Sequence, residues 1–452
     1  MARVRSADEL ILTGRADTVE RLVARAASEV PGLGEKRSLQ SNNGQRSLKL
    51  GLISTGTGAS RDLMGQLAKW ARAGHGAVKA EPNCATGHPF RMEKGARGWG
   101  LDPWQWDEDP WQWDEDPWQW DEDPWQWDED PALPAVKAVG TTPAEGEVLF
   151  RRQGAFQKIG LTDAAGQRTA ALAAHLGEGV LVGIFDALPS QAVSYDWLTL
   201  HPAKVAKEDP WSDDDLSDHG LICASLIHAV APGARVHLYE ACGKDGHGRL
   251  FPLVEAISEF IDLAAGKPAV ISLSLGSLCT GGSAALRSVL QRATDQGMVV
   301  CAAAGNASHG TPKVSALLAA QVPAAFPNVI AVSASNMSDQ RATYSQRGDL
   351  AAPGGEALGR PGPDDAEDII GMGLSVGTSG YVAMDAGTSF STPLVAGAAA
   401  LLLEGQAVRD AKTYTRVLAA LKAAARDGAP SDGETLTSSG LGAGILYLPT
   451  LF

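Results

Sequence analysis

A serine that could act as a nucleophile lies in residues 387–393 (Gly-Thr-Ser-Phe-Ser-Thr-Pro), which lead into an apolar run over residues 394–403. The run predicts a buried helix, and Pro393 is tolerated in its first turn because the amides there have no helical partners to lose. Ser389 would then lie at a helix N-terminus, where unpaired amides and the helix dipole favour developing negative charge. Taken alone, the segment fits either an acyl-transfer nucleophile or the N-cap of a buried helix.

This segment resembles the Gly-Thr-Ser-x-Ser/Ala-x-Pro signature of the subtilase family (peptidase S8) of serine peptidases. Further segments resemble other motifs of that family and occur in the family's order. They are Val-Leu-Val-Gly-Ile-Phe-Asp at 180–186, Asp-His-Gly at 218–220, Val-Ala-Pro-Gly-Ala at 230–234, Val-Ile-Ser-Leu-Ser-Leu-Gly at 270–276, Ala-Ala-Ala-Gly-Asn at 302–306 and Ala-Pro-Gly at 352–354.

The resemblance implies that Asp186, His219 and Ser389 form a catalytic triad and that Asn306 belongs to an oxyanion hole. In that chemistry Ser389 attacks a peptide carbonyl, and His219 takes its proton and passes it to the leaving amine. Asp186 holds the imidazole in the right tautomer, while the Asn306 amide and the Ser389 backbone amide bind the oxyanion. The resemblance therefore predicts a serine endopeptidase that hydrolyses protein or peptide substrates through an acyl-enzyme.

Two positions beside these residues depart from the family's pattern. Ala187 and Leu188 follow the aspartate, where subtilases usually have Ser or Thr and then Gly, and Leu221 stands where they usually have Thr. These residues would support the dyad rather than react, so we expect weaker orientation of it. An intact catalyst is the favoured interpretation because the four polar residues of the triad and oxyanion hole are kept.

The substrate-binding backbone implied by the resemblance comes from two segments with small side chains. Their small size permits a large apolar substrate residue without requiring one. The predicted substrate-binding residues are Ser274, Leu275, Gly276, Ala303, Ala304 and Gly305.

Other titratable residues near His219 in the sequence are predicted to be structural. His228, His237 and His247 fall on different predicted elements, so we expect packing or surface roles and no metal site. An acidic run predicts a solvated loop that could favour basic substrate side chains; it comprises Asp213, Asp214, Asp215 and Asp218. No cofactor is required by this chemistry. Subtilases often bind structural calcium, which the resemblance implies, although the chain has no EF-hand-like spacing.

The elements that must position these residues alternate between short apolar runs and helical patterns. Apolar runs over 180–185, 235–240, 269–273, 299–303 and 329–333 fit strands buried on both faces. Helical stripes cover 253–261 and 286–293, and Gly266 and Gly297 follow them as stop signals. The alternation predicts an α/β fold over residues 156–452, a three-layer, mostly parallel sheet of subtilisin-like type with its site at the carboxyl ends of strands.

Residues 6–84 predict a separate, small α+β domain of split βαβ, ferredoxin-like type. We expect strands over 9–13, 48–52 and 77–81 and helices over 17–26 and 63–70. The size, position and element order resemble the inhibitory propeptide of subtilases (inhibitor I9-like), whose last strand enters the cleft as residues 78–83 would. The resemblance implies a zymogen in which this domain aids folding and acts as an intramolecular inhibitor until it is cleaved.

Residues 85–155 predict a low-complexity linker between the two domains. Asp-Pro-Trp-Gln-Trp-Asp-Glu occurs four times without a change within 102–130, and a proline every seventh residue rules out a continuous helix. Dense negative charge opposes collapse, so we expect disorder or loosely extended chain. A solvated spacer is favoured over an aromatic-acidic docking tract for a basic partner, although eight of the twelve tryptophans lie there.

The amino-acid composition limits which kinds of partner the chain can bind. The net charge is -15, but residues 102–130 hold 13 acids, and the rest of the chain has 38 basic against 40 acidic (53 minus 13) residues, or -2. This balance argues against a nucleic-acid partner.

The five cysteines have no CxxC pair, so we predict buried thiols and a reducing compartment. The first residues lack a signal-peptide pattern, and no apolar run approaches the ~20 residues that span a bilayer. We therefore expect a cytoplasmic protein without a membrane partner; secretion stays open.

Two other functions stay open at this point. In the first, the departures at Ala187 and Leu221 silence the triad, and the chain is a pseudoprotease scaffold that recruits partners through its tryptophan repeat. In the second, the chemistry is intact but serves as a dedicated maturation protease for one co-produced peptide.

Overall fold

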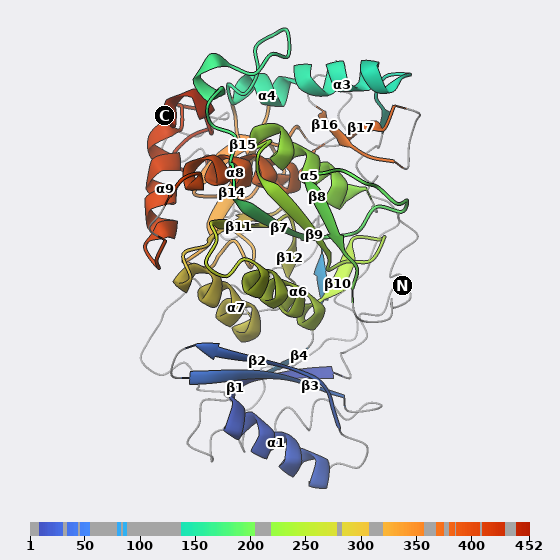
Figure 1. Ribbon diagram of the computed structural model, residues 1–452, viewed down its shortest axis with the longest axis vertical. Coiled ribbons are helices and arrows are strands. Elements are labelled where there is room, and N and C mark those ends of the chain that lie inside the picture. The colour runs from blue at the N-terminus through green and yellow to red at the C-terminus, as the bar shows by residue number, and fades with distance from the viewer. Residues whose placement is uncertain are drawn as a thin grey trace.

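The structure is a computed structural model (Figure 1). It describes residues 9–29, 34–43, 46–54, 79–82, 85–87, 137–203, 218–277, 283–306, 320–356, 368–374, 379–384, 386–406, 409–429 and 440–452. Within them, a four-stranded sheet with one helix precedes a larger body built on a seven-stranded sheet.

The seven-stranded sheet forms the centre of the larger body, and every pair of neighbouring strands in it is parallel. The five predicted strands are present, and they are buried because helices cover both faces. In spatial order the strands are β15 (Leu350–Pro353), β14 (Ile330–Ser335), β13 (Val299–Ala303), β11 (Ala269–Leu273), β7 (Leu181–Asp186), β9 (Arg235–Glu240) and β8 (Leu198–His201).

Helices cover the two faces of this sheet and give the predicted three layers (Figure 1). On one face, α5 (His219–Val230), α8 (Thr388–Leu403) and α9 (Thr413–Ala424) share an apolar core with the sheet. On the other face, α6 (Leu250–Leu263) and α7 (Ala284–Asp295) share a second core. The predicted stop signals after α6 and α7 hold, since Gly266 and Gly297 have φ of 74° and 80°, which favour glycine.

The two edge strands of the sheet, β8 and β15, were not predicted from the sequence. Each has only four residues. β8 is half-exposed, so it lacks the continuous apolar run of a buried strand, and β15 ends in a proline, which is tolerated at a sheet edge.

The larger body already begins within the range predicted as a linker. β6 (Lys137–Ala138) pairs with β17 (Tyr381–Met384), which pairs with β16 (Ile369–Met372). Helices α3 (Pro143–Arg152) and α4 (Gly154–Lys158) follow, with Phe150 and Phe156 in edge-to-face contact in the core. Short 3-10 helices lie at Ala170–Leu172 and Leu448–Thr450. The tryptophan repeat lies outside the described residues.

The N-terminal sheet has the strand order β2-β3-β1-β4, with antiparallel pairs throughout. Because β1 lies between β3 and β4, this is the predicted split βαβ arrangement. The elements are β1 (Glu9–Arg15), α1 (Ala16–Glu29), β2 (Gly34–Asn43), β3 (Arg46–Ser54) and β4 (Lys79–Pro82). β2 was missed because its sequence, Gly-Glu-Lys-Arg-Ser-Leu-Gln-Ser-Asn-Asn, is almost entirely polar. The helix predicted over 63–70 lies outside the described residues.

One face of the N-terminal sheet packs against the larger body. Ile11 on β1 is fully buried and belongs to the same apolar cluster as α6 and α7, against which Leu39 also packs. Figure 1 shows β1 to β4 facing α6 and α7, with α1 on the far side of the sheet. The N-terminal sheet and the larger body are therefore joined by direct apolar contact.

Helices α5 and α8 approach each other closely at a glycine. A Cβ added to Gly397 would lie 2.7 Å from the Val230 Cβ, closer than side-chain atoms normally come. Glycine in a helix interior costs about 1 kcal/mol relative to alanine. At this position the missing side chain allows the two helices to approach closely, which offsets that cost.

Replacing that glycine should therefore separate the helices. Gly397→Ala is expected to lower the free energy of unfolding by about 1–3 kcal/mol, the range for overpacked cores, although alanine is the better helix former. Urea unfolding followed by circular dichroism measures it. Val230→Gly removes the colliding Cβ, so the double variant should lose less than the sum of the two single losses. Equal or higher stability of Gly397→Ala would contradict this packing.

Candidate active site

The site forms where the carboxyl ends of three adjacent strands meet. Asp186 ends β7, Ser274 follows β11 directly, and Asn306 lies three residues beyond the end of β13. Because β13, β11 and β7 are parallel neighbours, these three residues share one edge of the sheet, as predicted. His219 and Ser389 reach the same edge from the first turns of α5 and α8.

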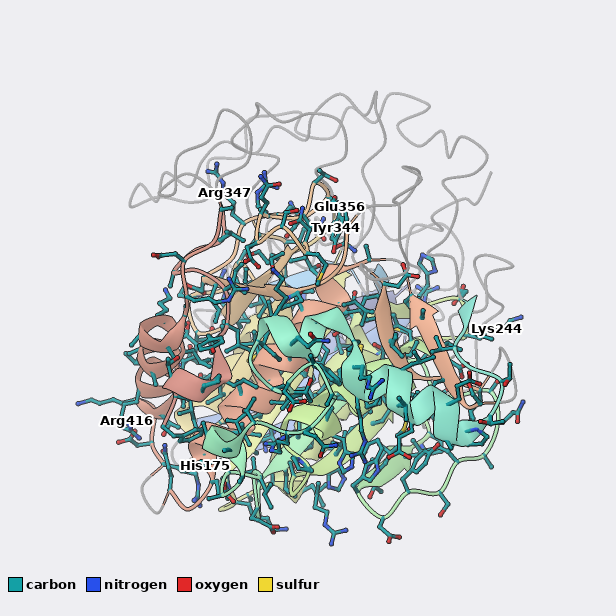
Figure 2. All side chains as sticks on the ribbon, turned by 90° about the horizontal axis from the view of Figure 1, so that it is seen from above. His175, Lys244, Tyr344, Arg347, Glu356 and Arg416 are labelled. Atoms are coloured by element: carbon teal, nitrogen blue, oxygen red, sulfur yellow. The ribbon has the colours of Figure 1, made fainter. Side chains whose placement is uncertain are left out.

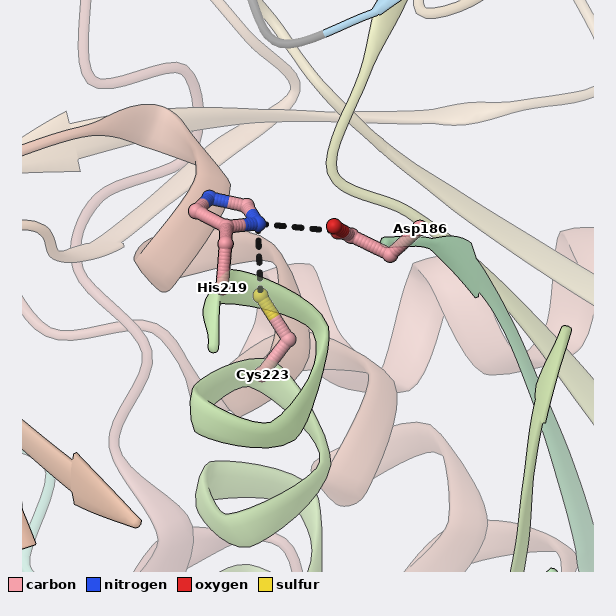
Figure 3. Close-up of side chains that lie close together, drawn as sticks. All are labelled: Asp186, His219 and Cys223. Atoms are coloured by element: carbon pink, nitrogen blue, oxygen red, sulfur yellow. Dashed lines mark hydrogen bonds and ion pairs between the residues drawn. The ribbon is translucent and has the colours of Figure 1, made fainter. Parts of the chain in front are cut away.

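Asp186 and His219 form a buried hydrogen-bonded pair (Figure 3). His219 Nδ1 lies 2.9 Å from Asp186 Oδ2, and the two side chains are 5% and 1% exposed. The other carboxylate oxygen, Oδ1, accepts a 2.7 Å hydrogen bond from the Ala187 backbone amide. Both oxygens are thus held, and the carboxylate fixes the Nδ1–H tautomer, which presents Nε2 as the basic nitrogen.

A glycine allows the helix that carries His219 to begin this close to the aspartate. A Cβ on Gly220 would lie 2.4 Å from the Ala187 carbonyl oxygen and 3.0 Å from the Asp186 Cβ. The departures from the family pattern fit this geometry. Ala187 supports the carboxylate through its backbone amide instead of a side chain, and Leu221 is fully buried in the core.

The environment of the pair raises the basicity of the imidazole. Burial lowers the pKa of His219, but the Asp186 carboxylate and Cys223 more than offset it, so the pKa lies above its ordinary value. A raised pKa suits a histidine that must accept and hold the proton of a nucleophile in a site from which water is excluded.

Ser389 is the second residue of α8 and is 3% exposed. Its hydroxyl donates to the Ser274 carbonyl oxygen at 3.3 Å, and the Ser274 hydroxyl donates to the Ser389 carbonyl oxygen at 2.7 Å. Cys223 Sγ bridges the two halves of the site, 3.5 Å from the Ser389 carbonyl oxygen and 3.9 Å from His219 Nδ1. The structure therefore gathers the three predicted triad residues, with the serine hydroxyl bonded to Ser274 rather than to His219.

Asn306 is oriented by the residue that precedes the serine. Its Oδ1 accepts hydrogen bonds from the Thr388 backbone amide at 3.0 Å and from the Thr388 hydroxyl at 2.8 Å. A backbone N–H can only donate, so the side-chain atom facing it must be the amide oxygen. Nδ2 consequently points away from Thr388 as a donor.

The turn before the serine is held by the Ala-Pro-Gly segment at 352–354. The Gly387 amide donates to the Gly354 carbonyl oxygen at 2.8 Å, and the Tyr344 hydroxyl donates to the same oxygen at 2.7 Å. Figure 2 shows Tyr344 beside Glu356, whose carboxylate accepts from the Thr343 hydroxyl at 2.6 Å. These bonds fix the backbone from which α8 starts.

One predicted substrate-binding segment is paired with the chain itself. β5 (Ala85–Gly87) lies between β12 (Gly276–Ser277) and β10 (His247–Arg249), antiparallel to both. Gly87 is the register partner of Gly276. A segment from the predicted linker thus occupies the centre of a three-stranded sheet that includes the predicted binding segment.

The other predicted substrate-binding residues lie at the same sheet edge. Gly305 has φ of 120°, and a Cβ there would meet the Gln346 side chain at 1.8 Å, so only glycine fits. The remaining residues of the prediction are buried: Ser274, Leu275, Ala303 and Ala304.

Of the other three histidines, His237 lies on β9 and His247 on β10, but His228 lies on α5 together with His219, contrary to the prediction. His228 stacks on Trp197, and burial lowers its pKa to about 4. His237 on β9 is hydrogen-bonded to His201 on the neighbouring strand β8, with 3.0 Å between His237 Nδ1 and His201 Nε2. His247 lies on β10, and its Nδ1 is 2.9 Å from the Asp245 carbonyl oxygen.

The prediction of a solvated loop was wrong for Asp218. This residue is buried, and its Oδ2 accepts a 2.6 Å hydrogen bond from the Leu374 amide. It ties the segment after β16 to the start of α5, a long-range contact that the local acidic sequence does not reveal. Asp213, Asp214 and Asp215 lie outside the described residues.

Among the described residues, one cluster of three groups could ligate a metal: Asp186, His219 and Cys223. Its imidazole and thiol do not suit calcium, which prefers oxygen ligands, so calcium binding stays a prediction from family.

Cys223, Cys242 and Cys301 are free and buried, as predicted, and Cys84 and Cys279 lie outside the described residues. Sequence reasoning missed the contact of Cys223 with His219, which their spacing of four residues on one helix could have indicated.

Comparison with known proteins identifies the family. The sequence model of the subtilase family matches residues 156–444, and the chain belongs to that family. It is 35% identical over 212 residues to subtilisin E of Bacillus subtilis (strain 168), covering 44% of this chain and 48% of that protein. It is 30% identical over 259 residues to subtilisin BL of Lederbergia lenta, covering 52% of this chain and 81% of that protein.

A solved structure of the prenylagaramide maturation protease PagA is also similar, with 24% identity, a TM-score of 0.43 and coverage of 60% of this chain and 92% of that one. The chain spans about half the length of several curated relatives that it matches, 48% in the case of subtilisin E. In the part of the chain that the structure describes, no helix has the length and apolar character to cross a membrane.

The aspartate should control the protonation of the histidine. Asp186→Asn removes the charge that offsets burial, so the pKa of His219 should fall below its ordinary value of about 6.5. Histidine NMR titration of the variant and of the unchanged protein measures the shift. Asp262→Asn, an exposed site on α6, serves as the matched control and should leave this titration in place. An unshifted His219 in Asp186→Asn would show that the pair does not set its pKa.

Proposed function

We propose that the chain is a serine endopeptidase of the subtilase family in which Asp186, His219 and Ser389 form the catalytic triad. The observation that carries the proposal is the buried 2.9 Å bond between Asp186 and His219 beside a serine at a helix N-terminus. The family match and the order Asp, His, Ser along the chain support it.

In this mechanism Ser389 first turns from the Ser274 carbonyl toward His219 Nε2. Its oxygen forms a bond to the substrate carbonyl carbon while Nε2 takes the hydroxyl proton, and Asp186 stabilises the imidazolium. His219 then gives the proton to the leaving amine as the C–N bond breaks, which leaves an acyl-enzyme. Water repeats the sequence and releases the acid product.

The negative charge on the carbonyl oxygen would be met by two donors. Asn306 Nδ2 is available because Thr388 holds the amide oxygen of that side chain. The Ser389 amide lies in the first turn of α8, where backbone N–H groups have no helical acceptor. Such donors act strongly because the site is dry and its dipoles are already oriented.

We also propose that the N-terminal α+β domain is an inhibitory propeptide and that the chain is a zymogen. Two contacts support this. The N-terminal sheet packs on α6 and α7, and β5, which follows it, pairs with Gly276 of the predicted substrate-binding segment. A peptide substrate would need the edge that β5 now pairs with, so the chain would inhibit itself by strand addition. Cleavage after this domain would release the site.

Activity labelling separates the enzyme from the pseudoprotease scaffold. A fluorophosphonate probe should label the unchanged protein and not Ser389→Ala, whereas Ser391→Ala, two residues along the same helix, should retain labelling. Incubation and mass measurement should show self-shortening in the unchanged protein alone. Absence of labelling in processed protein would sink the endopeptidase proposal, and a cleavage profile restricted to one peptide would identify a dedicated maturation protease instead.

The oxyanion donor gives a graded prediction. Asn306→Ala should lower kcat by about 100- to 1000-fold with little change in KM, because the donor acts in the transition state. Thr388→Val removes the hydroxyl that bonds Asn306 and should cause a smaller loss. Thr388→Ser keeps the hydroxyl and should retain most activity. Steady-state kinetics on a peptide amide checks all three, and an unchanged kcat in Asn306→Ala contradicts the role of this side chain.

A further inference from the structure

We propose that Asp218 is a positioning residue, which locks the hairpin of β16 and β17 to α5 and thereby fixes Ser389 relative to His219. The inference rests on the endopeptidase function proposed above. Asp218 takes no part in that mechanism, yet it is only 4% exposed and immediately precedes His219 at the start of α5. A carboxylate is costly to bury unless hydrogen bonds satisfy it, so its place beside the Asp186–His219 pair needs a structural reason.

The edge of β16 that faces away from β17 is held by side chains of other elements. Alternate residues of a strand bond to opposite edges, and Gly373, in the set that faces β17, donates to the Gly380 carbonyl oxygen at 3.2 Å. On the other edge the backbone amides of Ile370, Met372 and Leu374 donate to side-chain oxygens of Gln153, Ser225 and Asp218, respectively, at 3.3, 3.0 and 2.6 Å. Each of the three accepting side chains is at most 4% exposed. They take the place that a further strand would have.

Two of these acceptors come from the helix that carries His219. Asp218 directly precedes α5 and Ser225 lies in its second turn, with Ile222 between them. Spacings of four and three residues place all three side chains on one face of the helix. A Cβ added to Gly371 would lie 2.5 Å from Ile222 Cγ2, so β16 approaches this face as closely as a glycine allows. The hairpin therefore packs against the first two turns of α5 (Figure 1).

The same hairpin leads to the serine. β17 ends at Met384, five residues before Ser389, and the buried Phe390 ring lies 5.3 Å from the His219 ring, centroid to centroid. A shift of the hairpin relative to α5 would therefore displace the hydroxyl relative to the imidazole. In the proposed mechanism Ser389 must turn from the Ser274 carbonyl oxygen to His219 Nε2, so their separation matters. A misplacement of about 1 Å can cost about 100-fold in rate.

Among the three side-chain acceptors, Asp218 is the one nearest to the reacting groups in the chain. It adjoins His219, whereas Ser225 lies six residues beyond His219, about 9 Å along the helix axis. Asp218 also makes the last bond of the row, while the bond of Ser225 is flanked by those of Gln153 and Asp218. Ser225 is therefore a matched control, because it bonds the same strand edge from the same helix face.

Steady-state kinetics of the processed enzyme on a peptide amide tests this role. Asp218→Ala should lower kcat by about 10- to 100-fold with little change in KM, because the substrate edge at β10 and β12 belongs to other elements. Asp218→Asn keeps an oxygen that accepts from the Leu374 amide and should retain most of kcat, as should Ser225→Ala. An unchanged kcat in Asp218→Ala, or an equal loss in Asp218→Asn or Ser225→Ala, overturns the proposal.

Hydrogen exchange of the full-length Ser389→Ala protein, followed by mass spectrometry, tests the lock without catalysis. Adding Asp218→Ala should speed exchange over residues 370–374 about fivefold or more, whereas adding Asp218→Asn should not. The helix α9 should keep its protection in both. Unchanged exchange over 370–374, or equal loss of protection in α9, overturns the proposal. Because this measurement needs no activity, a failure of the endopeptidase proposal leaves its result intact, and the two failures are distinguishable.

Discussion

The buried contact between Asp186 and His219 is the constraint on which the rest of the structure depends. A carboxylate removed from water is strongly disfavoured unless hydrogen bonds satisfy it, so the aspartate needs the Ala187 amide and the imidazole together. The Ala187 amide is adjacent to the aspartate in the sequence, but the imidazole comes from 33 residues further along the chain. The parallel sheet and the start of α5 must therefore both be in place before the pair can exist.

Backbone approach is how the fold meets that constraint. Gly220 lets α5 touch the end of β7, Gly354 lets the Ala-Pro-Gly segment touch the turn before α8, and Gly397 lets α8 touch α5. Each replaces a side chain by direct contact between elements. The result is that two helix N-termini converge on one sheet edge, which places the His219 imidazole against the Asp186 carboxylate and the Ser389 hydroxyl against the Ser274 carbonyl oxygen. Stability of this arrangement comes from the two apolar cores, and the polar site is held on top of them.

The predictable part of the molecule is the part in which local pattern and long-range packing agree. Strands buried on both faces read as apolar runs, and motif order predicted Asp186, His219, Ser389 and Asn306 as site residues, which the structure brings to one edge of the sheet. The polar strand β2 and the edge strands β8 and β15 escaped because their partners, not their own residues, make them strands. Asp218 and Cys223 escaped for a related reason, since their contacts with Leu374 and Ser389 come from distant parts of the chain.

The position of β5 bears on how latency would be achieved under the proposed function. The Asp186–His219 bond is fully formed while β5 is paired with Gly276, so inhibition would act by occupying the substrate edge and not by distorting the dyad. A tethered strand has a high effective concentration at its own binding edge, so a free peptide competes poorly with it. Cutting the tether removes that advantage without any rearrangement of the dyad. A site assembled in advance and blocked by its own chain therefore needs only one hydrolytic event to become available.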